Sequence, residues 1–121
     1  MKTGIVVDDA AIMRMRLREI LESSYDVVGE AGDGDEAVRL YEELKPDFVT
    51  LDISMPGTNG MDALQRLHEK HPQAKVIIVS AVGQKRLVID ALQMGAADFV
   101  IKPFEPDRVM KAVDRLFVNG S

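Results

Sequence analysis

The sequence contains no cysteine and no tryptophan among its 121 residues, and aromatic residues make up only 5% of it. Without cysteine the chain can form no disulfide, no zinc–thiolate site and no thiol nucleophile, which is consistent with a reducing compartment. So few aromatic rings disfavour a stacking surface for nucleic-acid bases. These absences exclude thiol chemistry and disfavour nucleic acid as a partner.

Long apolar runs are also missing. No run approaches the roughly 18 residues that span a bilayer, and the start Met1-Lys2 is followed by Asp8 and Asp9 instead of the apolar region of a signal peptide. Fifteen basic residues against twenty acidic ones give a net charge of −5, which disfavours general binding to a nucleic-acid backbone or an anionic membrane. We therefore expect a cytoplasmic protein with no membrane insertion and no nucleic-acid partner.

The length of 121 residues is close to that of one domain. Folding at this size buries roughly 65% of the surface of the unfolded chain, so the core needs no metal or disulfide to support it. We expect one domain over residues 1–118, acting as a monomer, followed at 119–121 by a disordered tail or a remnant foreign to the domain.

Four short runs rich in β-branched residues are apolar at almost every position instead of alternating, and they cover 5–7, 48–51, 76–79 and 99–101. Parallel strands that are covered on both faces show this pattern. A weaker run from Val27 to Glu30 contains glycine and is predicted to be an edge or second strand. The sequence therefore predicts five parallel strands.

Helical spacing of apolar residues lies between and after these runs, over 13–21, from Asp33 to just before Pro46, and over 59–69, 84–94 and 106–117. Asp33 with Glu36 forms a start like a capping box, and Pro106 suits the first helical position. Regular strand–helix alternation predicts an α/β fold, a doubly wound five-stranded parallel sheet with five helices on its two faces. The functional site of such a sheet lies at the carboxyl ends of its strands.

Polar side chains follow the predicted strands where the strands end, and these are Asp8, Asp9, Asp52, Ser80 and Lys102. Three carboxylates in one cleft repel one another unless a cation neutralises them, and hard oxygen ligands favour Mg²⁺ over zinc. A Mg²⁺ site with a lysine and a hydroxyl suits phosphoryl transfer, where positioning and charge neutralisation supply most of the catalysis. Asp52 is the predicted nucleophile and Asp8-Asp9 the predicted metal cradle.

The sequence resembles the receiver domain of two-component response regulators over essentially its whole length. The likeness rests on VVDDA, LDISMPGTNGMDAL, SA at 80 and KPF at 102, at the intervals of that family. Within the family it is strongest to single-domain chemotaxis regulators, in Met13-Arg14, SAVGQ at 80–84 and GAADFVIKPF at 95–104. The resemblance implies the flavodoxin-like arrangement of five strands and five helices.

The resemblance also assigns roles to the polar residues at the strand ends. It makes Asp52 the residue that a CheA-like histidine kinase phosphorylates. It makes Asp9, Asp52 and the backbone carbonyl of Ser54 the Mg²⁺ ligands, with Asp8 acting mainly through water. Lys102 is then expected to pair with the phosphoryl oxygens.

A switch is implied by the same resemblance. Ser80 is expected to bind the phosphoryl group and to act with Phe99, which occupies the aromatic switch position. Many relatives have tyrosine where this chain has Phe99, so a hydrogen bond from that ring is lost while a steric coupling remains. The peptide bond between Lys102 and Pro103 is expected to be cis.

The resemblance implies a signalling switch that is not an enzyme, apart from assisting its own phosphorylation and dephosphorylation. The implied partners are the histidine kinase, a flagellar motor switch protein and a chemotaxis phosphatase. The expected output surface is formed by the last two helices and the last strand, with positive charge from Lys85, Arg86, Arg108 and Lys111. This surface suits an acidic amphipathic peptide.

Three alternatives stay open at this point. The chain could be another stand-alone phosphorelay receiver, or a receiver taken from a longer regulator. It could also be a Mg²⁺-dependent phosphatase of the haloacid dehalogenase type, which uses an aspartate nucleophile after a strand. Those enzymes have a second aspartate two residues later, where this chain has Ser54, and serine cannot protonate a leaving group.

Basic and imidazole side chains away from the strand ends receive no functional role. Arg14 and Arg18 share one face of the first predicted helix, and we interpret that face as solvated. His68 and His71 lie far in the sequence from every strand-end motif.

Overall fold

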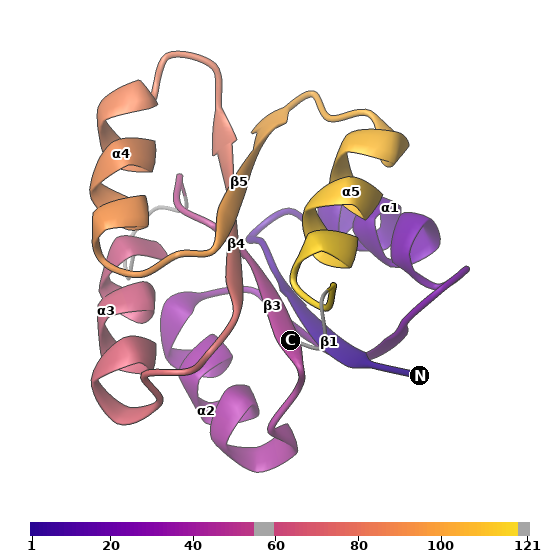
Figure 1. Cartoon of the computed structure of the whole chain (residues 1–121), viewed down its shortest axis with the longest axis horizontal. Helices are drawn as coiled ribbons and strands as arrows, with labels where there is room; N and C mark the ends of the chain where they lie inside the picture. Colours follow the sequence, from indigo (N-terminus) through magenta and orange to yellow (C-terminus); the bar gives the residue numbers. More distant parts are fainter. Residues whose placement is uncertain (55–59, 119–121) are drawn as a thin grey trace.

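The computed structural model describes residues 1–54 and 60–118, over which strands and helices alternate (Figure 1). The strands are β1 (Thr3–Val7), β2 (Asp26–Ala31), β3 (Phe48–Asp52), β4 (Val76–Ala81) and β5 (Asp98–Lys102). The helices are α1 (Ala11–Leu21), α2 (Gly34–Leu44), α3 (Gly60–Lys70), α4 (Lys85–Gln93) and α5 (Pro106–Arg115). The sheet is parallel, in the order β2-β1-β3-β4-β5. The predicted fold class is confirmed, and the predicted tail at 119–121 lies outside the described residues.

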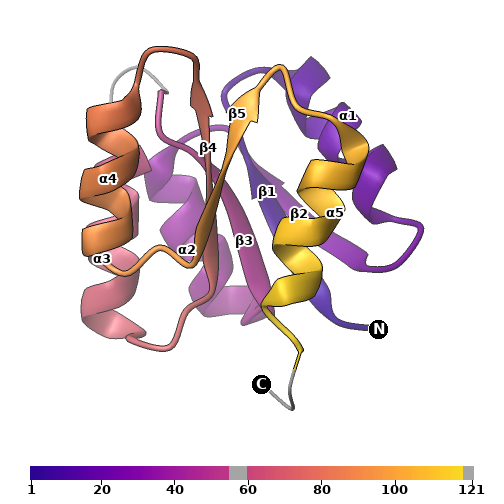
Figure 2. The same cartoon turned by 45° about the horizontal axis from the view of Figure 1, so that its top comes forward.

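Helices cover both faces of the sheet. α1 and α5 lie on one face, and α2, α3 and α4 lie on the other (Figures 1 and 2). Val6 and Phe48 belong to the core beneath α1 and α5, whereas Ile5 and Leu51 belong to the core beneath the other three helices. Because successive side chains of a strand point to opposite faces, both buried, the strands are almost continuously apolar.

The start of α2 differs in detail from the predicted capping box. The side chain of Asp33 accepts the backbone N–H of Glu36 at 2.8 Å, as a helix N-cap does. The side chain of Glu36 does not return to Asp33, because its Oε1 accepts the backbone N–H of Gly32 at 2.9 Å. Lys45, with a φ of 46°, caps the other end of α2 before Pro46.

Helix boundaries differ from the prediction by one or two residues. α1 begins at Ala11, two residues before the first residue of its apolar stripe, Met13, because a helix begins at its cap and not at its first core contact. The predicted start of the third helix at Asn59 lies outside the described residues. None of the helices within residues 1–54 and 60–118 is long and apolar enough to cross a bilayer.

The topology determines where functional side chains can meet. The chain leaves β1 toward β2 on one side and adds β3, β4 and β5 on the other, so the winding reverses between β1 and β3. The carboxyl ends of all five strands face one edge, which is at the top in Figure 2. A crevice outside this edge is the usual binding place in open α/β sheets.

Candidate functional site

Strand register brings the predicted site residues to one edge of the sheet. Asp52 is the last residue of β3 and pairs with Val79, so Ser80 lies one residue beyond it on β4. Lys102 ends β5 and pairs with Ala81. Asp8 directly follows β1, the other neighbour of β3. Residues 8, 52, 80 and 102 therefore gather although the sequence separates them widely.

Three carboxylates form a cluster at this edge. One oxygen from each of Asp8, Asp9 and Asp52 lies within 4.8 Å of the others. Asp8 is 0% exposed and Asp52 is 1% exposed, whereas Asp9 faces solvent. An all-carboxylate donor set with one open side fits Mg²⁺, which prefers oxygen ligands and retains several waters.

The ammonium group of Lys102 lies between two of these carboxylates. Its Nζ is 3.0 Å from Asp8 Oδ2 and 3.1 Å from Asp52 Oδ2. Burial alone would lower the pKa of Lys102, but the two carboxylates outweigh it and the pKa is raised, so the amine is charged. The pKa of Asp8 is raised mainly by burial, although the N–H of Ala10 and the charge of Lys102 oppose this.

Hydrogen bonds also hold the other oxygen of each of the two buried carboxylates, Asp8 and Asp52. Asp52 Oδ1 accepts the backbone N–H of Ser54 at 2.8 Å and its hydroxyl at 2.6 Å. Asp8 Oδ1 accepts the backbone N–H of Ala10 at 2.9 Å. The orientation of both buried carboxylates is thus determined from two sides before any ligand binds.

A close backbone approach explains one glycine of the motif after β3. A Cβ on Gly60 would lie 2.4 Å from the carbonyl oxygen of Asp52 and 2.7 Å from the Cα of Ile53. Only a residue without a side chain lets α3 begin directly against the end of β3. Met55 and Pro56 of the same motif lie outside the described residues.

The two predicted switch residues have different surroundings. Ser80 is 0% exposed, and its Oγ has no hydrogen-bond partner within the part of the chain that the structure describes. Phe99 is half-buried, and the guanidinium of Arg108 lies 5.6 Å from its ring centroid and donates to its backbone carbonyl. The peptide bond between Lys102 and Pro103 is cis in the structure.

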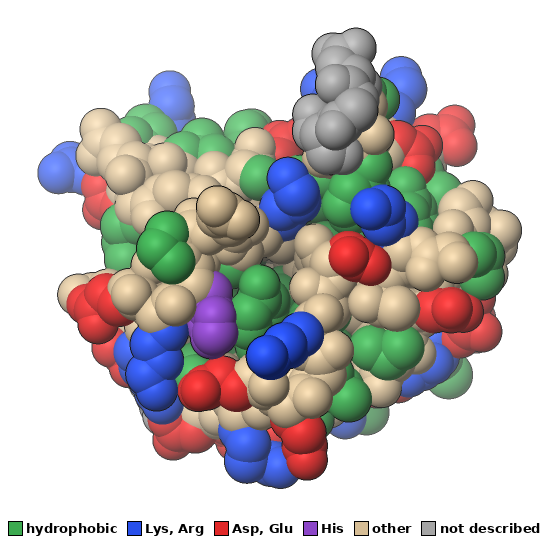
Figure 3. Space-filling view, turned by 60° about the horizontal axis from the view of Figure 1, so that its bottom comes forward, with side chains coloured by type: hydrophobic (Ala, Val, Ile, Leu, Met, Phe, Trp, Pro, Cys, Tyr) green, Lys and Arg blue, Asp and Glu red, His purple; other side chains and the backbone are tan. Residues whose placement is uncertain are grey.

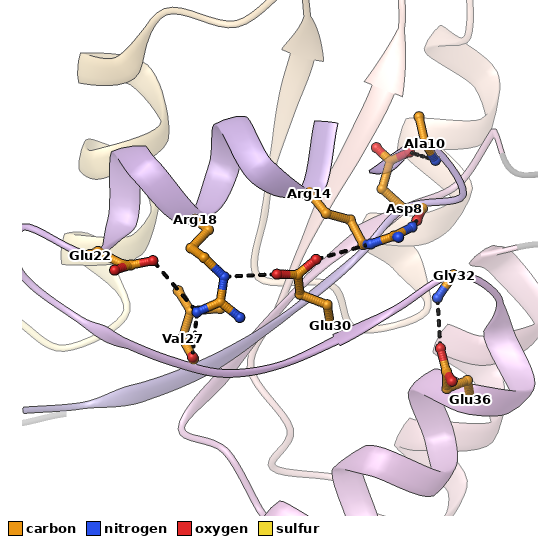
Figure 4. Close-up of polar contacts among 9 residues, drawn as sticks. All are labelled: Asp8, Ala10, Arg14, Arg18, Glu22, Val27, Glu30, Gly32 and Glu36. Carbon is orange, nitrogen blue, oxygen red and sulfur yellow. Dashed lines mark hydrogen bonds and ion pairs between the residues drawn. The ribbon is translucent and has the colours of Figure 1, made fainter. Parts of the chain in front are cut away.

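A polar network beside the acid loop, shown in Figure 4, was not predicted from the sequence. Arg14 and Arg18 do not face solvent freely, because both bind Glu30 of β2, with Nε–Oε distances of 3.1 and 2.7 Å. The interpretation of this helix face as solvated is wrong. The two arginines are four residues apart in the sequence and flank the apolar stripe of the helix. This spacing was the available sign that both side chains lie beside the edge of the sheet.

The two histidines lie away from the acid cluster. His71 precedes β4 and therefore lies at the opposite end of the sheet, where its ring packs against Tyr41 with centroids 4.9 Å apart. Figure 3 views the molecule from this side and shows a histidine in a hollow. The ring of His68 lies beneath Gly95, on the side of the sheet that α3 and α4 cover.

The model of the response regulator receiver domain matches residues 5–114 of this chain. The chain belongs to this family. The matched range includes every residue that the sequence analysis placed at the strand ends.

Individual relatives make the placement more specific. The chain is 50% identical to the chemotaxis protein CheY of Thermotoga maritima over 116 residues, which cover 95% of this chain and 97% of that protein. It is also 50% identical, over 113 residues, to protein CcdB of Bacillus subtilis, covering 93% and 94%. Among solved structures it is similar to one chain in the crystal structure of a CheX–CheY complex with BeF₃ and Mg²⁺ from Borrelia burgdorferi, with a TM-score of 0.92 and 36% identity, and the match covers 98% of this chain and 90% of that chain.

These comparisons confirm the predicted family and the flavodoxin-like fold. The chain is a receiver domain closely related to CheY, of the two-component response regulator class. Receivers of this type are signalling switches and not classical enzymes. Membership of this family therefore disfavours the phosphatase alternative.

Proposed function

We propose that this receiver accepts a phosphoryl group on Asp52 from a CheA-like histidine kinase, in a Mg²⁺-dependent reaction, and thereby changes its affinity for a partner. The observation that carries the proposal is the position of Asp52: it is 1% exposed, it belongs to the acid cluster, and its Oδ2 lies 3.1 Å from the ammonium of Lys102. Asp8 also contacts Lys102, but it lies in the loop that follows β1, next to a second acid. Asp52 is the acid at the end of a central strand.

The proposed transfer is a displacement at phosphorus. A carboxylate oxygen of Asp52 forms a bond to phosphorus while the bond from phosphorus to the imidazole nitrogen of the kinase breaks, and the electron pair returns to that nitrogen. The leaving imidazole then takes up a proton from solvent. Lys102 would pair with the phosphoryl oxygens as negative charge accumulates.

A bound Mg²⁺ would supply charge neutralisation at the transferring group. Asp9, Asp52 and the backbone carbonyl of Ser54 would hold it, with Asp8 acting through water. The support is the donor set itself, three carboxylates whose oxygens approach within 4.8 Å with one of them open to solvent.

Metal binding can be tested without any phosphoryl donor. We expect Mg²⁺ titration, followed by calorimetry and by the backbone amide signals near Asp9, to show binding that Asp9→Ala and Asp52→Asn each weaken at least about tenfold. Glu43→Gln is the control, because it removes an exposed acid of α2 outside the cluster. Unchanged affinity in both cluster variants would place the ion elsewhere and contradict this part of the proposal.

The proposed output runs through Ser80 and Phe99. A phosphoryl group on Asp52 gives the buried Ser80 hydroxyl, which has no partner among the described residues, an acceptor to move toward. That movement would let Phe99 turn inward. Phe99 forms part of an apolar groove of about 350 Å³, together with Val82, Val88, Ile89, Leu92 and Ile101.

The charge at this surface is smaller than the sequence suggests. Arg86 Nε lies 3.5 Å from Asp90 Oδ1, and Arg108 Nη2 lies 3.2 Å from Asp98 Oδ1, so the charges of both arginines are partly offset. Lys85 lines the groove. An acidic amphipathic segment, such as one of a flagellar motor switch protein, remains the proposed partner. A chemotaxis phosphatase is a further proposed partner, and the receiver is proposed to act as a monomer.

The switch is tested by measuring peptide affinity with and without beryllofluoride, a mimic of the phosphoryl group. We expect an acidic amphipathic peptide to bind the mimic-bound protein about five- to 150-fold more tightly, the usual range of allosteric coupling. Ser80→Ala should remove most of this difference, whereas Ser23→Ala, an exposed serine, should retain it. Equal affinities for the free and mimic-bound native protein would reject the switch, and an unimpaired Ser80→Ala would reject only the route through Ser80.

A further inference from the structure

Arg14 connects the edge strand β2 to the loop that carries the two adjacent acids (Figure 4). Its Nη1 donates to the backbone carbonyl of Asp8 at 2.6 Å, and its Nε donates to Glu30 Oε1 at 3.1 Å. The side chain is 22% exposed, so these bonds are partly shielded from water. A rigid guanidinium therefore bridges a carboxylate of β2 and the main chain of Asp8.

The bridge is one of four contacts that surround Asp8. The backbone N–H of Asp8 donates to the carbonyl of Ala31 at 3.0 Å, its carbonyl accepts from Arg14, and its side chain binds the N–H of Ala10 and the ammonium of Lys102. Two of these four contacts come from β2 or through a residue bound to β2. An edge strand that supplies no residue to the acid cluster thus helps to fix the main chain of Asp8.

Glu30 also binds a second arginine, through its other oxygen. Arg18 Nε donates to Glu30 Oε2 at 2.7 Å, and Arg18 Nη1 donates to the carbonyl of Val27 at 3.1 Å. Each oxygen of Glu30 therefore has its own arginine. The bonds of Arg18 go to Glu30, Val27 and Glu22 and not to Asp8, so the two arginines share a partner and a helix face but differ in what they reach.

We propose that Arg14, anchored by Glu30, is a positioning residue for Mg²⁺ at the acid cluster, because it fixes the main chain of Asp8 and with it the direction of the Asp8 and Asp9 side chains. The inference rests on the proposed function, in which this cluster binds the ion. Groups that orient metal ligands from outside the ligand set commonly contribute tenfold or more to metal affinity.

An electrostatic role and a positioning role of Arg14 predict opposite changes in Mg²⁺ affinity when Arg14 is replaced. Removing a positive charge near a cation site strengthens cation binding when only the field matters. Removing the group that orients the ligands weakens it. Arg14→Gln therefore separates the two explanations, and Arg18→Gln is the matched control, because it removes an equal charge and a bond to Glu30 but no bond to Asp8.

The experiment measures Mg²⁺ affinity by calorimetry and the hydrogen exchange of the Ala10 amide without metal, in the full chain. We expect Arg14→Gln to weaken Mg²⁺ binding about tenfold and to speed exchange at Ala10, whose N–H binds the Asp8 side chain. Arg18→Gln should leave Mg²⁺ affinity within about twofold of the native value. Equal affinities in the two variants, or tighter binding by Arg14→Gln, would overturn the inference.

Arg14→Lys provides the second variant, since it keeps the charge but lacks the planar fork that joins the two acceptors. We expect most of the loss of Mg²⁺ affinity to persist, and full recovery would show that charge suffices and would overturn positioning. The variants Asp52→Asn and Asp9→Ala distinguish a failure of the positioning role from a failure of the proposed metal site. If Asp52→Asn and Asp9→Ala both leave native Mg²⁺ binding unchanged, the proposed site fails; if they weaken binding while Arg14→Gln does not, only the positioning role fails.

Discussion

Lys102 Nζ lies 3.1 Å from Asp52 Oδ2, although 50 residues separate the two in the chain. The lysine ends one strand and the aspartate ends another, with β4 between them. The same ammonium also lies 3.0 Å from Asp8 Oδ2. The ammonium of Lys102 therefore neutralises carboxylates of the same cluster that would bind the proposed Mg²⁺.

Replacing Lys102 by methionine should separate these two cations. Lys102→Met leaves two buried carboxylates without their partner, and we expect a loss of about 3 kcal/mol in the free energy of unfolding in EDTA. Added Mg²⁺ should recover much of that loss and should bind more tightly than to the native protein. Urea unfolding with and without Mg²⁺ measures both effects, and a variant as stable as the native protein in EDTA would contradict the neutralising role.

Asp8 is expected to reduce stability at neutral pH. Its folded-state pKa is raised mainly by burial, so the folded protein binds this proton more tightly than the unfolded chain does. The free energy of unfolding therefore falls as pH rises from the ordinary pKa of Asp8 through its folded-state pKa. In EDTA, Asp8→Asn should raise the free energy of unfolding at pH 7 on the order of 1 kcal/mol, with no gain at pH 3. A loss of stability at pH 7 would contradict the sign.

Glu30 is expected to show the opposite dependence. The hydrogen bond from Arg18 lowers its pKa, with burial opposing and Arg14 assisting. A lowered folded-state pKa adds stability above the ordinary pKa, and this stability is lost as pH falls through the folded-state value. Glu30→Gln should lower the free energy of unfolding by about 0.5–1 kcal/mol at pH 7, because the side chain is 32% exposed and screened. The same urea series measures it, and an equal loss at pH 2 and pH 7 would show that charge is not the cause.

Gly60→Ala should damage both fold and site. Its Cβ would meet the backbone of Asp52 at 2.4 Å, so α3 or the end of β3 must shift. We expect a loss of about 1–3 kcal/mol in the free energy of unfolding and slower phosphorylation from a small donor. Gly32→Ala is the matched control, since its Cβ would meet only Arg14 Nη1 at an ordinary 3.7 Å. Comparable losses in both variants would show that the close approach at Gly60 is not the cause.

Much of the fold was predictable because burial on both faces leaves a strong local pattern. Val76 to Val79 are all buried, and that run predicts β4 directly. β2 was harder to predict, because it is an edge strand in which Val28 is 43% exposed and Gly29 interrupts the apolar pattern. Its place in the sheet depends on pairing with β1, which no local pattern records.

The candidate site was predictable as far as strand ends determine it. Asp8, Asp52 and Lys102 meet because parallel strands end at one edge, and the alternation of strands and helices along the sequence is enough to imply this. The bonds of Arg14 to Glu30 and to the carbonyl of Asp8 were not predictable. They depend on the register of β2 against β1 and on the rotation of α1, which are set by tertiary packing and not by local sequence.

The most direct test of the central claim is to locate the phosphoryl group. The native protein is incubated with a small acyl-phosphate-type donor and Mg²⁺, trapped with borohydride and analysed by mass spectrometry, with Asp52→Asn and an EDTA-treated sample as controls. We predict a label on Asp52 alone, absent from Asp52→Asn and strongly reduced in EDTA. A label on Asp8, Asp9 or a histidine, or full labelling in EDTA, would contradict the account.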